Sequence, residues 1–312
     1  MKIAMQTAGV IDQLGFEKGY AAIANAGFEA IDWGIDNSLT YSKITSATGS
    51  ADCIFEKELD EILAYYEEEL SYMKKYGLTI TQAHAPFPCH IPEKPYVFEY
   101  LLEIYKKMIL FCDKVGCKYL VVHGHSISRN KPEESAEEMD AINDRLYTSL
   151  IPTLLQTDVV VCLENLFQTG GADMVSGVCG DPREAVEMID VYNRIAGKEC
   201  FGFCLDTGHM NVLSHDPRRY IPVLGHRIKT LHIHDNDGKV DRHKAPYTGN
   251  INWKGFYDSL RQIGYEGDLS FETCGQLRPK TPEPELIEPW LTLMAAIGKH
   301  FRNKILADGE QA

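Results

Sequence analysis

Short apolar runs rich in β-branched residues alternate with longer amphipathic segments along the whole chain, and this strand-then-helix pattern recurs eight times in 312 residues. Strands that alternate with helices form a parallel sheet covered by helices, and near-continuous apolar strands are buried on both faces. Eight such units in about 300 residues suit a closed barrel better than an open doubly wound sheet. We therefore predict an α/β protein, a single-domain (β/α)8 TIM barrel over residues 1–312.

Two longer insertions interrupt the pattern, near 37–56 and 168–181, and their Gly and Ser content suits rims or lids over the active-site end of the barrel. Plain surface loops are the alternative. The expected strands are residues 2–7, 27–34, 78–84, 117–125, 158–164, 200–206, 227–234 and 267–272. The expected helices lie near residues 16–26, 57–76, 95–115, 134–156, 182–196, 217–224, 253–263 and 284–303.

Composition excludes several classes of function. The net charge of −14, from 31 basic and 45 acidic residues, disfavours nucleic acid and anionic membranes as partners. The nine cysteines are scattered, which indicates reduced thiols and a cytoplasmic location. No apolar run approaches the roughly 20 residues of a membrane span, and no GxGxxG or P-loop motif indicates a nucleotide. We expect a small-molecule substrate, and homo-oligomerisation stays open.

Polar side chains stand at the C-terminal end of every expected strand. In a TIM barrel these ends converge on the active site. Three of the eight are histidines and four are acids, both of which bind metals. The eight positions are Gln6, Asp32, His84, His123, Glu164, Asp206, His234 and Glu272.

Four of these residues are predicted to bind one divalent metal: Glu164, Asp206, His234 and Glu272. Three oxygen donors and one nitrogen favour Mn²⁺ first, with Mg²⁺ or Co²⁺ as alternatives, whereas further histidine ligands would favour Zn²⁺. Such a metal would polarise a substrate carbonyl and stabilise an enediolate as it forms. Glu164 and Glu272 are the candidate acid and base that move the proton, and the alternative is that they act as ligands only.

Further residues near these strand ends are predicted to bind substrate: His209, His84, His123, His243 and Trp33. His209, in DTGH, has binding a second metal as its alternative role, and Trp33 has core packing. Asp241 and His243 form either an extra ligand pair or part of a solvated loop. His232 shares its strand face with His234 and is expected one layer deeper, as a hydrogen-bonding support.

Seven motifs together resemble the xylose isomerase-like TIM barrel superfamily, which includes sugar and sugar-phosphate isomerases, epimerases and nucleases of the endonuclease IV type. They are HAPFP (84–88), VVHGH (121–125), LENL (163–166), LDTGHMN (205–211), HIHDND (232–237), DRHKAPYTGNINW (241–253) and FET (271–273). The resemblance to ketose 3-epimerases implies the same four metal ligands, proton exchange by the two glutamates and substrate contact by His209. The epimerases have an arginine where this chain has His243.

Other members of the superfamily suggest alternatives. Nine residues match the three-zinc ligand set of the abasic-site nucleases: His84, His123, Glu164, Asp206, His209, His234, Asp241, His243 and Glu272. The acidic net charge opposes DNA binding. A metal-dependent lyase or dehydratase, a sugar-cleaving enzyme and a catalytically silent subunit are further alternatives. The favoured prediction is a metal-dependent carbohydrate isomerase or epimerase.

Overall fold

A computed structural model of the chain describes residues 1–307 except 48, 127–134, 171–172, 274–276 and 278–282. The described chain divides into two compact units. Unit 1 comprises Met1–Asp32, Tyr72–Thr81 and Cys204–Ala312, and unit 2 comprises Trp33–Ser71 and Gln82–Phe203. We describe each unit by itself.

An eight-stranded sheet has the order β10-β1-β2-β3-β4-β5-β8-β9. In unit 1, β1 pairs in parallel with both β2 and β10, and in unit 2, β4 pairs in parallel with both β3 and β5. The (β/α)8 TIM-barrel fold predicted from the sequence is confirmed. The strands are β1 (Ile3–Gln6), β2 (Ala30–Trp33), β3 (Thr79–His84), β4 (Tyr119–Val121), β5 (Val160–Glu164), β8 (Phe201–Asp206), β9 (Ile228–His232) and β10 (Leu269–Phe271).

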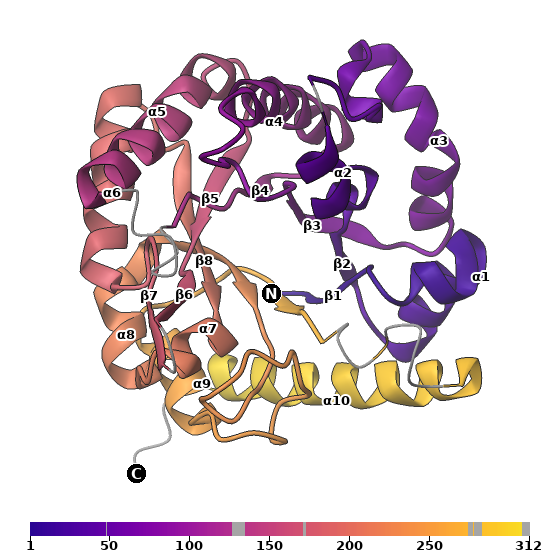
Figure 1. Ribbon diagram of the computed structural model, residues 1–312. Coiled ribbons are helices and arrows are strands. Elements are labelled where there is room, and N and C mark those ends of the chain that lie inside the picture. Colours follow the sequence, from indigo (N-terminus) through magenta and orange to yellow (C-terminus); the bar gives the residue numbers. More distant parts are fainter. Residues whose placement is uncertain (48, 127–134, 171–172, 274–276, 278–282, 308–312) are drawn as a thin grey trace. The chain divides into compact units, whose positions relative to one another are not determined.

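Helices follow the strands along the chain, as Figure 1 shows. Their starts carry local signals: α6 begins with Asp181 as N-cap and a proline at its first position, and Ser135 and Glu138 form a capping box before α5. The α-helices among the described residues are α1 (Ile11–Ala26), α2 (Tyr41–Ser46), α3 (Leu59–Lys75), α4 (Tyr96–Val115), α5 (Ala136–Leu154), α6 (Pro182–Ala196), α7 (Thr207–Val212), α8 (Pro217–Leu224), α9 (Trp253–Gln262) and α10 (Ile287–Leu306).

In unit 1, the C-terminal helix α10 packs against α1 and α9 and against strands β1 and β10. Gly298 makes this contact possible, because a Cβ there would lie 2.5 Å from Cγ2 of Ile3 and 2.9 Å from Phe271. Trp253 of α9 stacks on Phe301 of α10, with ring centroids 5.1 Å apart. The C-terminal helix therefore covers the first residue of β1 and the last residue of β10.

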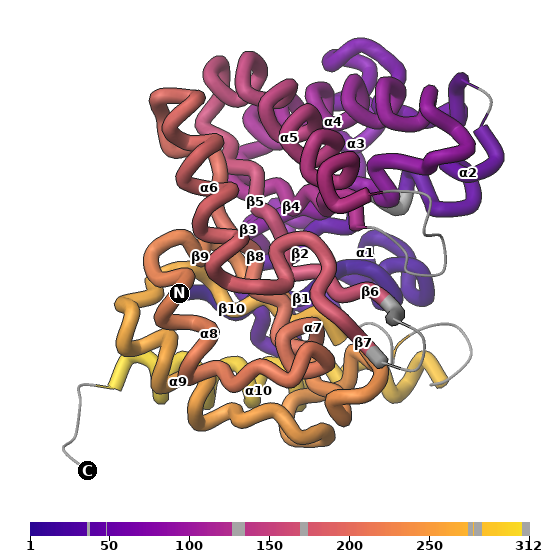
Figure 2. Tube along the Cα trace, turned by 60° about the vertical axis from the view of Figure 1, so that its left-hand side comes forward, coloured from indigo at the N-terminus to yellow at the C-terminus, as the bar shows by residue number. Residues whose placement is uncertain are grey.

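In unit 2, α4 and α5 lie side by side, as the turned view of Figure 2 also shows. An aromatic cluster fills the core beside them, in which Trp33 contacts Tyr66 and Phe111 at centroid distances of 5.1 and 5.5 Å. None of the helices in the described ranges is both long and apolar enough to cross a membrane.

The two expected insertions contain regular structure that the sequence did not reveal. The first holds α2 between two short 3₁₀ helices, Ile35–Ser38 and Ile54–Glu56. The second holds an antiparallel hairpin of β6 (Phe167–Gly170) and β7 (Asp173–Ser176). Their role as rims or lids stays a prediction.

Candidate metal centre

Three of the four predicted metal ligands lie together in unit 1. Asp206 ends β8, while His234 and Glu272 follow the ends of β9 and β10 by two residues and one residue. One ligand atom from each lies within 4.8 Å of the other two. Nε2 of His234 is 2.8 Å from Oδ2 of Asp206, and both side chains are fully buried.

The DTGH motif builds this contact through the first turn of α7. Oδ1 of Asp206 accepts the backbone N–H of His209 at 2.7 Å as the helix N-cap, so that Oδ2 remains directed at His234. The hydroxyl of Thr207 bonds the backbone of His234, accepting from its N–H at 3.0 Å and lying 2.7 Å from its carbonyl oxygen. Gly208 leaves room for the imidazole, because a Cβ there would lie 1.9 Å from Cε1 of His234.

The loop after β9 adds Asp241 and His243 to the cluster. The rings of His234 and His243 are stacked, with centroids 4.0 Å apart and planes 10° from parallel. Oδ2 of Asp241 lies 2.8 Å from Nε2 of His243 and 3.5 Å from Nε2 of His209. Both side chains are part-buried beside His234, and their role as an extra ligand pair stays a prediction.

The charges of the cluster shift two pKa values in opposite directions. Burial acts to raise the pKa of Asp241, but hydrogen bonds from His209 and His243 outweigh burial and hold this pKa well below its usual range. Burial acts to lower the pKa of His243, but the negative charges of Glu272 and Asp241 outweigh burial and raise this pKa to about 9. The cluster is therefore an environment that favours positive charge.

The donor set fits a divalent cation. Nδ1 of His234 and Oδ1 of Asp241 are buried 3.6 Å apart, and neither atom has a hydrogen-bond partner within the described residues. His234, Asp241 and His243 also present one ligand atom each within 4.8 Å of one another. Carboxylate oxygens and imidazole nitrogens suit Zn²⁺, Mn²⁺ and related metals, and buried atoms with unmet bonding capacity are what a cation would use.

A second layer of polar side chains holds Glu272 from the core side. His232 is 1% exposed, and its Nδ1 lies 3.3 Å from Oε2 of Glu272 while its Nε2 lies 3.3 Å from Oδ2 of Asp32. Gln6 donates from Nε2 to Oε1 of Glu272 at 3.0 Å. His232 is therefore buried beside Glu272 and Asp32, and its role as a hydrogen-bonding support stays a prediction.

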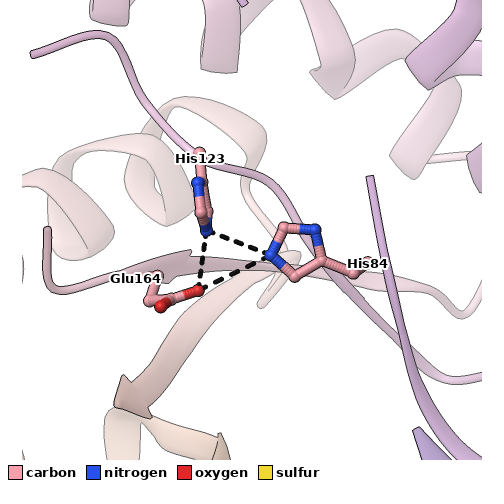
Figure 3. Close-up of side chains that lie close together, drawn as sticks. All are labelled: His84, His123 and Glu164. Carbon is pink, nitrogen blue, oxygen red and sulfur yellow. Dashed lines mark hydrogen bonds and ion pairs between the residues drawn. The ribbon is translucent and has the colours of Figure 1, made fainter. Parts of the chain in front are cut away.

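The fourth predicted ligand, Glu164, lies in unit 2 beside His84 and His123 (Figure 3). Nε2 of His123 is 2.9 Å from Oε2 of Glu164 and 3.0 Å from Nε2 of His84. The three residues also present ligand atoms within 4.8 Å of one another, so they too could hold a metal. Nδ1 of His84 lies 2.7 Å from the carbonyl oxygen of Ala85, which turns Nε2 toward the other two residues.

The backbone around His123 is held by buried side chains of α5. Asn143 accepts the N–H of His125 at 2.7 Å and donates to its carbonyl oxygen at 2.9 Å, and the Tyr147 hydroxyl donates to the carbonyl oxygen of Val122 at 3.1 Å. Gly124 fits between them, because a Cβ there would meet Oδ1 of Asn143 at 2.8 Å. No sequence signal distinguished Asn143 from other polar residues of a helix.

One predicted substrate residue needs a correction. Trp33 is 2% exposed, packs in the aromatic core of unit 2 and donates its indole N–H to Glu69 at 2.9 Å. Its alternative role, core packing, is therefore the one that the structure supports, because a buried indole offers a substrate almost no surface. Phe87 is instead 45% exposed, and its ring centroid is 4.7 Å from that of His123.

With this geometry described, the chain can be compared with known proteins. The model of the xylose isomerase-like TIM barrel family matches residues 20–294. The chain belongs to this family. A sequence relative, the probable endonuclease 4 of Mycoplasmopsis agalactiae, is 26% identical over 217 residues, which make up 64% of this chain and 70% of the relative.

Two solved structures of low sequence identity share the fold. One is a D-tagatose 3-epimerase-like protein, with a TM-score of 0.67 and 19% identity, covering 98% of this chain and 100% of that chain. The other is the IOLI protein with a bound zinc atom, with a TM-score of 0.69 and 16% identity, covering 99% of this chain and 100% of that chain. At this level of identity the likeness establishes the fold alone.

Proposed function

We propose that the chain is a divalent-metal-dependent isomerase or epimerase of a small sugar or related polyol. The observation that carries the proposal is the group of Asp206, His234 and Glu272, two of them buried and one part-buried, at the ends of three strands of unit 1. The D-tagatose 3-epimerase-like protein and a D-psicose 3-epimerase among the proteins of the same fold support the carbohydrate class.

In this proposal Asp206, His234 and Glu272 hold the metal, together with Glu164 as the sequence predicted. A bound divalent cation would polarise the sugar carbonyl and offset negative charge on the neighbouring oxygens. Mn²⁺ is the first candidate from the sequence-derived ligand set. The added proximity of Asp241 and His243 to His234 strengthens the case for Zn²⁺.

Glu272 is suited to take a proton from carbon. The Gln6 amide at 3.0 Å and His232 at 3.3 Å hold its carboxylate, so it keeps one orientation while the proton is transferred. We assign Glu164 as the partner that returns a proton to a neighbouring carbon or to the opposite face of the same carbon. This assignment rests on its place at the end of β5 and on the family resemblance.

His209 and His243 are the proposed substrate contacts in unit 1, and both already face a carboxylate of the cluster. An imidazole that donates to a sugar hydroxyl would fix which carbon faces Glu272. In unit 2, His84 and His123 are the proposed substrate contacts, and Phe87 offers an exposed ring for the apolar face of a sugar.

An abasic-site endonuclease is the second candidate, favoured by the probable endonuclease 4 relatives and by the additional His84–His123–Glu164 cluster. The net charge of −14 speaks against DNA as the substrate. A dehydratase would be distinguished from an isomerase by the release of water from its substrate.

Two measurements on the purified protein test the proposal. Metal analysis gives the identity and number of bound ions, and incubation of the Mn²⁺-loaded and Zn²⁺-loaded protein with ketoses in D₂O reports proton exchange at carbon by NMR. We expect deuterium uptake with no loss of water, and none in Glu272→Gln. Three zinc ions with cleavage of an abasic oligonucleotide would support the nuclease instead, and release of water would support a dehydratase.

A further inference from the structure

Asp235, the residue directly after His234, is fully buried and accepts four N–H groups. Oδ1 accepts the backbone N–H of Asn236 at 2.9 Å and of Ile251 at 3.4 Å. Oδ2 accepts the backbone N–H of Gly249 at 3.0 Å and the indole N–H of Trp253 at 3.0 Å. Each oxygen therefore has two donors, which is the full capacity of an ionised carboxylate in this arrangement.

The backbone of Asp235 also closes the loop that carries two residues of the metal centre. Its N–H donates to the carbonyl oxygen of Lys244 at 2.8 Å, and its carbonyl oxygen accepts the N–H of Lys244 at 2.9 Å. The loop between these residues includes Asp241 and His243, and His243 has a φ of 46°, in the left-handed region. The backbone pair of Asp235 and Lys244 therefore joins the first and last residues of this loop, directly after His234.

The segment 249–253 can reach the carboxylate because residue 249 is a glycine. A Cβ at Gly249 would lie 2.1 Å from the carbonyl oxygen of Asn236 and 2.3 Å from Oδ1 of Asp235. The same carboxylate therefore ties three chain segments together: the end of the β9 region, the return of the loop and the start of α9.

We propose that Asp235 is a positioning residue for the metal centre: its carboxylate holds the 236–251 loop so that Asp241 and His243 face His234. The inference rests on the proposed function in taking this centre to be the metal site. The position of Asp235 requires a side chain with two hydrogen-bond acceptor atoms. An asparagine would direct its NH₂ at one of the two donor pairs, whichever way the amide is turned, because all four partners are N–H groups.

The test is the affinity of Asp235→Asn for Mn²⁺ and Zn²⁺, measured by calorimetry well below the melting temperature. We expect affinity to fall about 10–100-fold, the usual range when a residue that orients a metal ligand is lost. We also expect faster amide hydrogen exchange in peptides of residues 236–251. Asp258→Asn, on α9 of the same unit, is the matched control because it removes the same charge from ion pairs with Lys254 and Arg261.

Trp253→Phe is the second variant, and it serves if Asp235→Asn does not fold. It deletes one of the four donors and keeps a ring against Phe301. We expect a loss of a few-fold in metal affinity. Metal affinity and loop exchange equal to those of the parent, in whichever folded variant is measured, would overturn the inference.

The failure of the proposed function has a different signature. A parent protein that binds metal but exchanges no proton on any sugar would refute the isomerase proposal and leave the affinity comparison intact. In an active parent, Asp235→Asn saturated with metal should lower kcat with little change in KM, because a displaced ligand set impairs turnover more than ground-state binding.

Discussion

The clusters in the two units differ in composition and in how they are held. In unit 1 the group around His234 contains three carboxylates, those of Asp206, Asp241 and Glu272. In unit 2 two imidazoles accompany the single carboxylate of Glu164. Because carboxylates in close proximity repel one another, the unit 1 group depends more strongly on positive charge nearby.

The supports of the two clusters differ in the same way. The charged carboxylate of Asp235, with four N–H donors, holds the loop of unit 1. The neutral amide of Asn143 holds the backbone next to His123 in unit 2 with one donor and one acceptor. Both are buried side chains that bind backbone and do not reach the ligands themselves. This chain therefore uses both a carboxylate and a neutral amide to hold the backbone beside its site residues.

The strongest test of this comparison removes one glutamate from each cluster. We expect Glu272→Gln and Glu164→Gln each to lower kcat about 10²–10⁴-fold, because an amide cannot exchange a proton with carbon. Turnover is measured as deuterium exchange into a ketose, and unchanged thermal melting shows that the fold is intact. Glu266→Gln and Glu103→Gln, at exposed positions in unit 1 and unit 2, are the controls.

The two variants need not agree, and their disagreement would be informative. If Glu272→Gln is inactive while Glu164→Gln turns over normally, the assignment of Glu164 as a proton donor is wrong.

A substitution of glycine tests how the rings are placed. Gly208→Ala puts a methyl group where Cε1 of His234 lies 1.9 Å away, so the imidazole must move off Asp206. We expect metal affinity to fall about 10–100-fold, by analogy with the loss of other groups that orient ligands. Metal titration checks this prediction.

Gly124→Ala in unit 2 is the matched comparison. Its Cβ would meet the side chains of Asn143, Tyr147 and Val178 and not a ligand ring. It should therefore lower stability more than metal affinity. Equal metal affinity in Gly208→Ala and the parent protein would show that His234 is not a ligand.

The neutral support in unit 2 should matter chiefly for stability. Asn143→Ala leaves the buried N–H and carbonyl group of His125 without their side-chain partner, which should cost on the order of 2–3 kcal/mol of unfolding free energy. Asn143→Asp keeps the acceptor for the N–H but turns a carboxylate oxygen toward the carbonyl oxygen in a buried place, so its loss should be at least as large. Urea unfolding measures both, and a loss below about 0.5 kcal/mol in Asn143→Ala would contradict the proposed support.

The elements of the fold were predictable because their signals are local. Helix α6 was expected at residues 182–196 and lies there, since Asp181, Pro182 and Gly197 mark its start and end. The short helix α7 was missed, because its six residues follow β8 directly and share the N-cap Asp206 with the strand end. The polar ends of the strands were likewise readable, because each lies at the boundary of an apolar run.

The contacts between site residues were not predictable in the same way. Asp241 reaches His234 only because Asp235 ties the loop to residues that lie 14 to 18 positions further along the chain. Trp33 was assigned to the substrate, but Glu69 and the rings of Tyr66 and Phe111 draw it into the core. A single sequence states which side chains are available, whereas burial depends on segments that are distant along it.

The smallest expected effect concerns a second carboxylate with four donors, Glu56 in the first insertion of unit 2. Burial acts to raise its pKa, but hydrogen bonds from Tyr100, Ser50 and the N–H groups of Cys53 and Ala51 outweigh burial and lower the pKa to about 2. In the unfolded chain the pKa of a glutamate is about 4.3. The ionised Glu56 carboxylate therefore stabilises the folded state above that pH, and this stabilisation is lost as the pH falls toward the folded-state pKa.

Because Glu56 is partly exposed, its contribution should be about 1 kcal/mol or less. Urea unfolding of the parent protein and Glu56→Gln should show a stability difference at pH 6 that shrinks by pH 3. A difference that stays constant across this range would mean that the lowered pKa does not stabilise the fold. Asp235 has four N–H donors in a fully buried place, whereas two of the donors to Glu56 are hydroxyls that can instead bond to water. We therefore expect Glu56→Gln to be milder than Asp235→Asn at every pH tested.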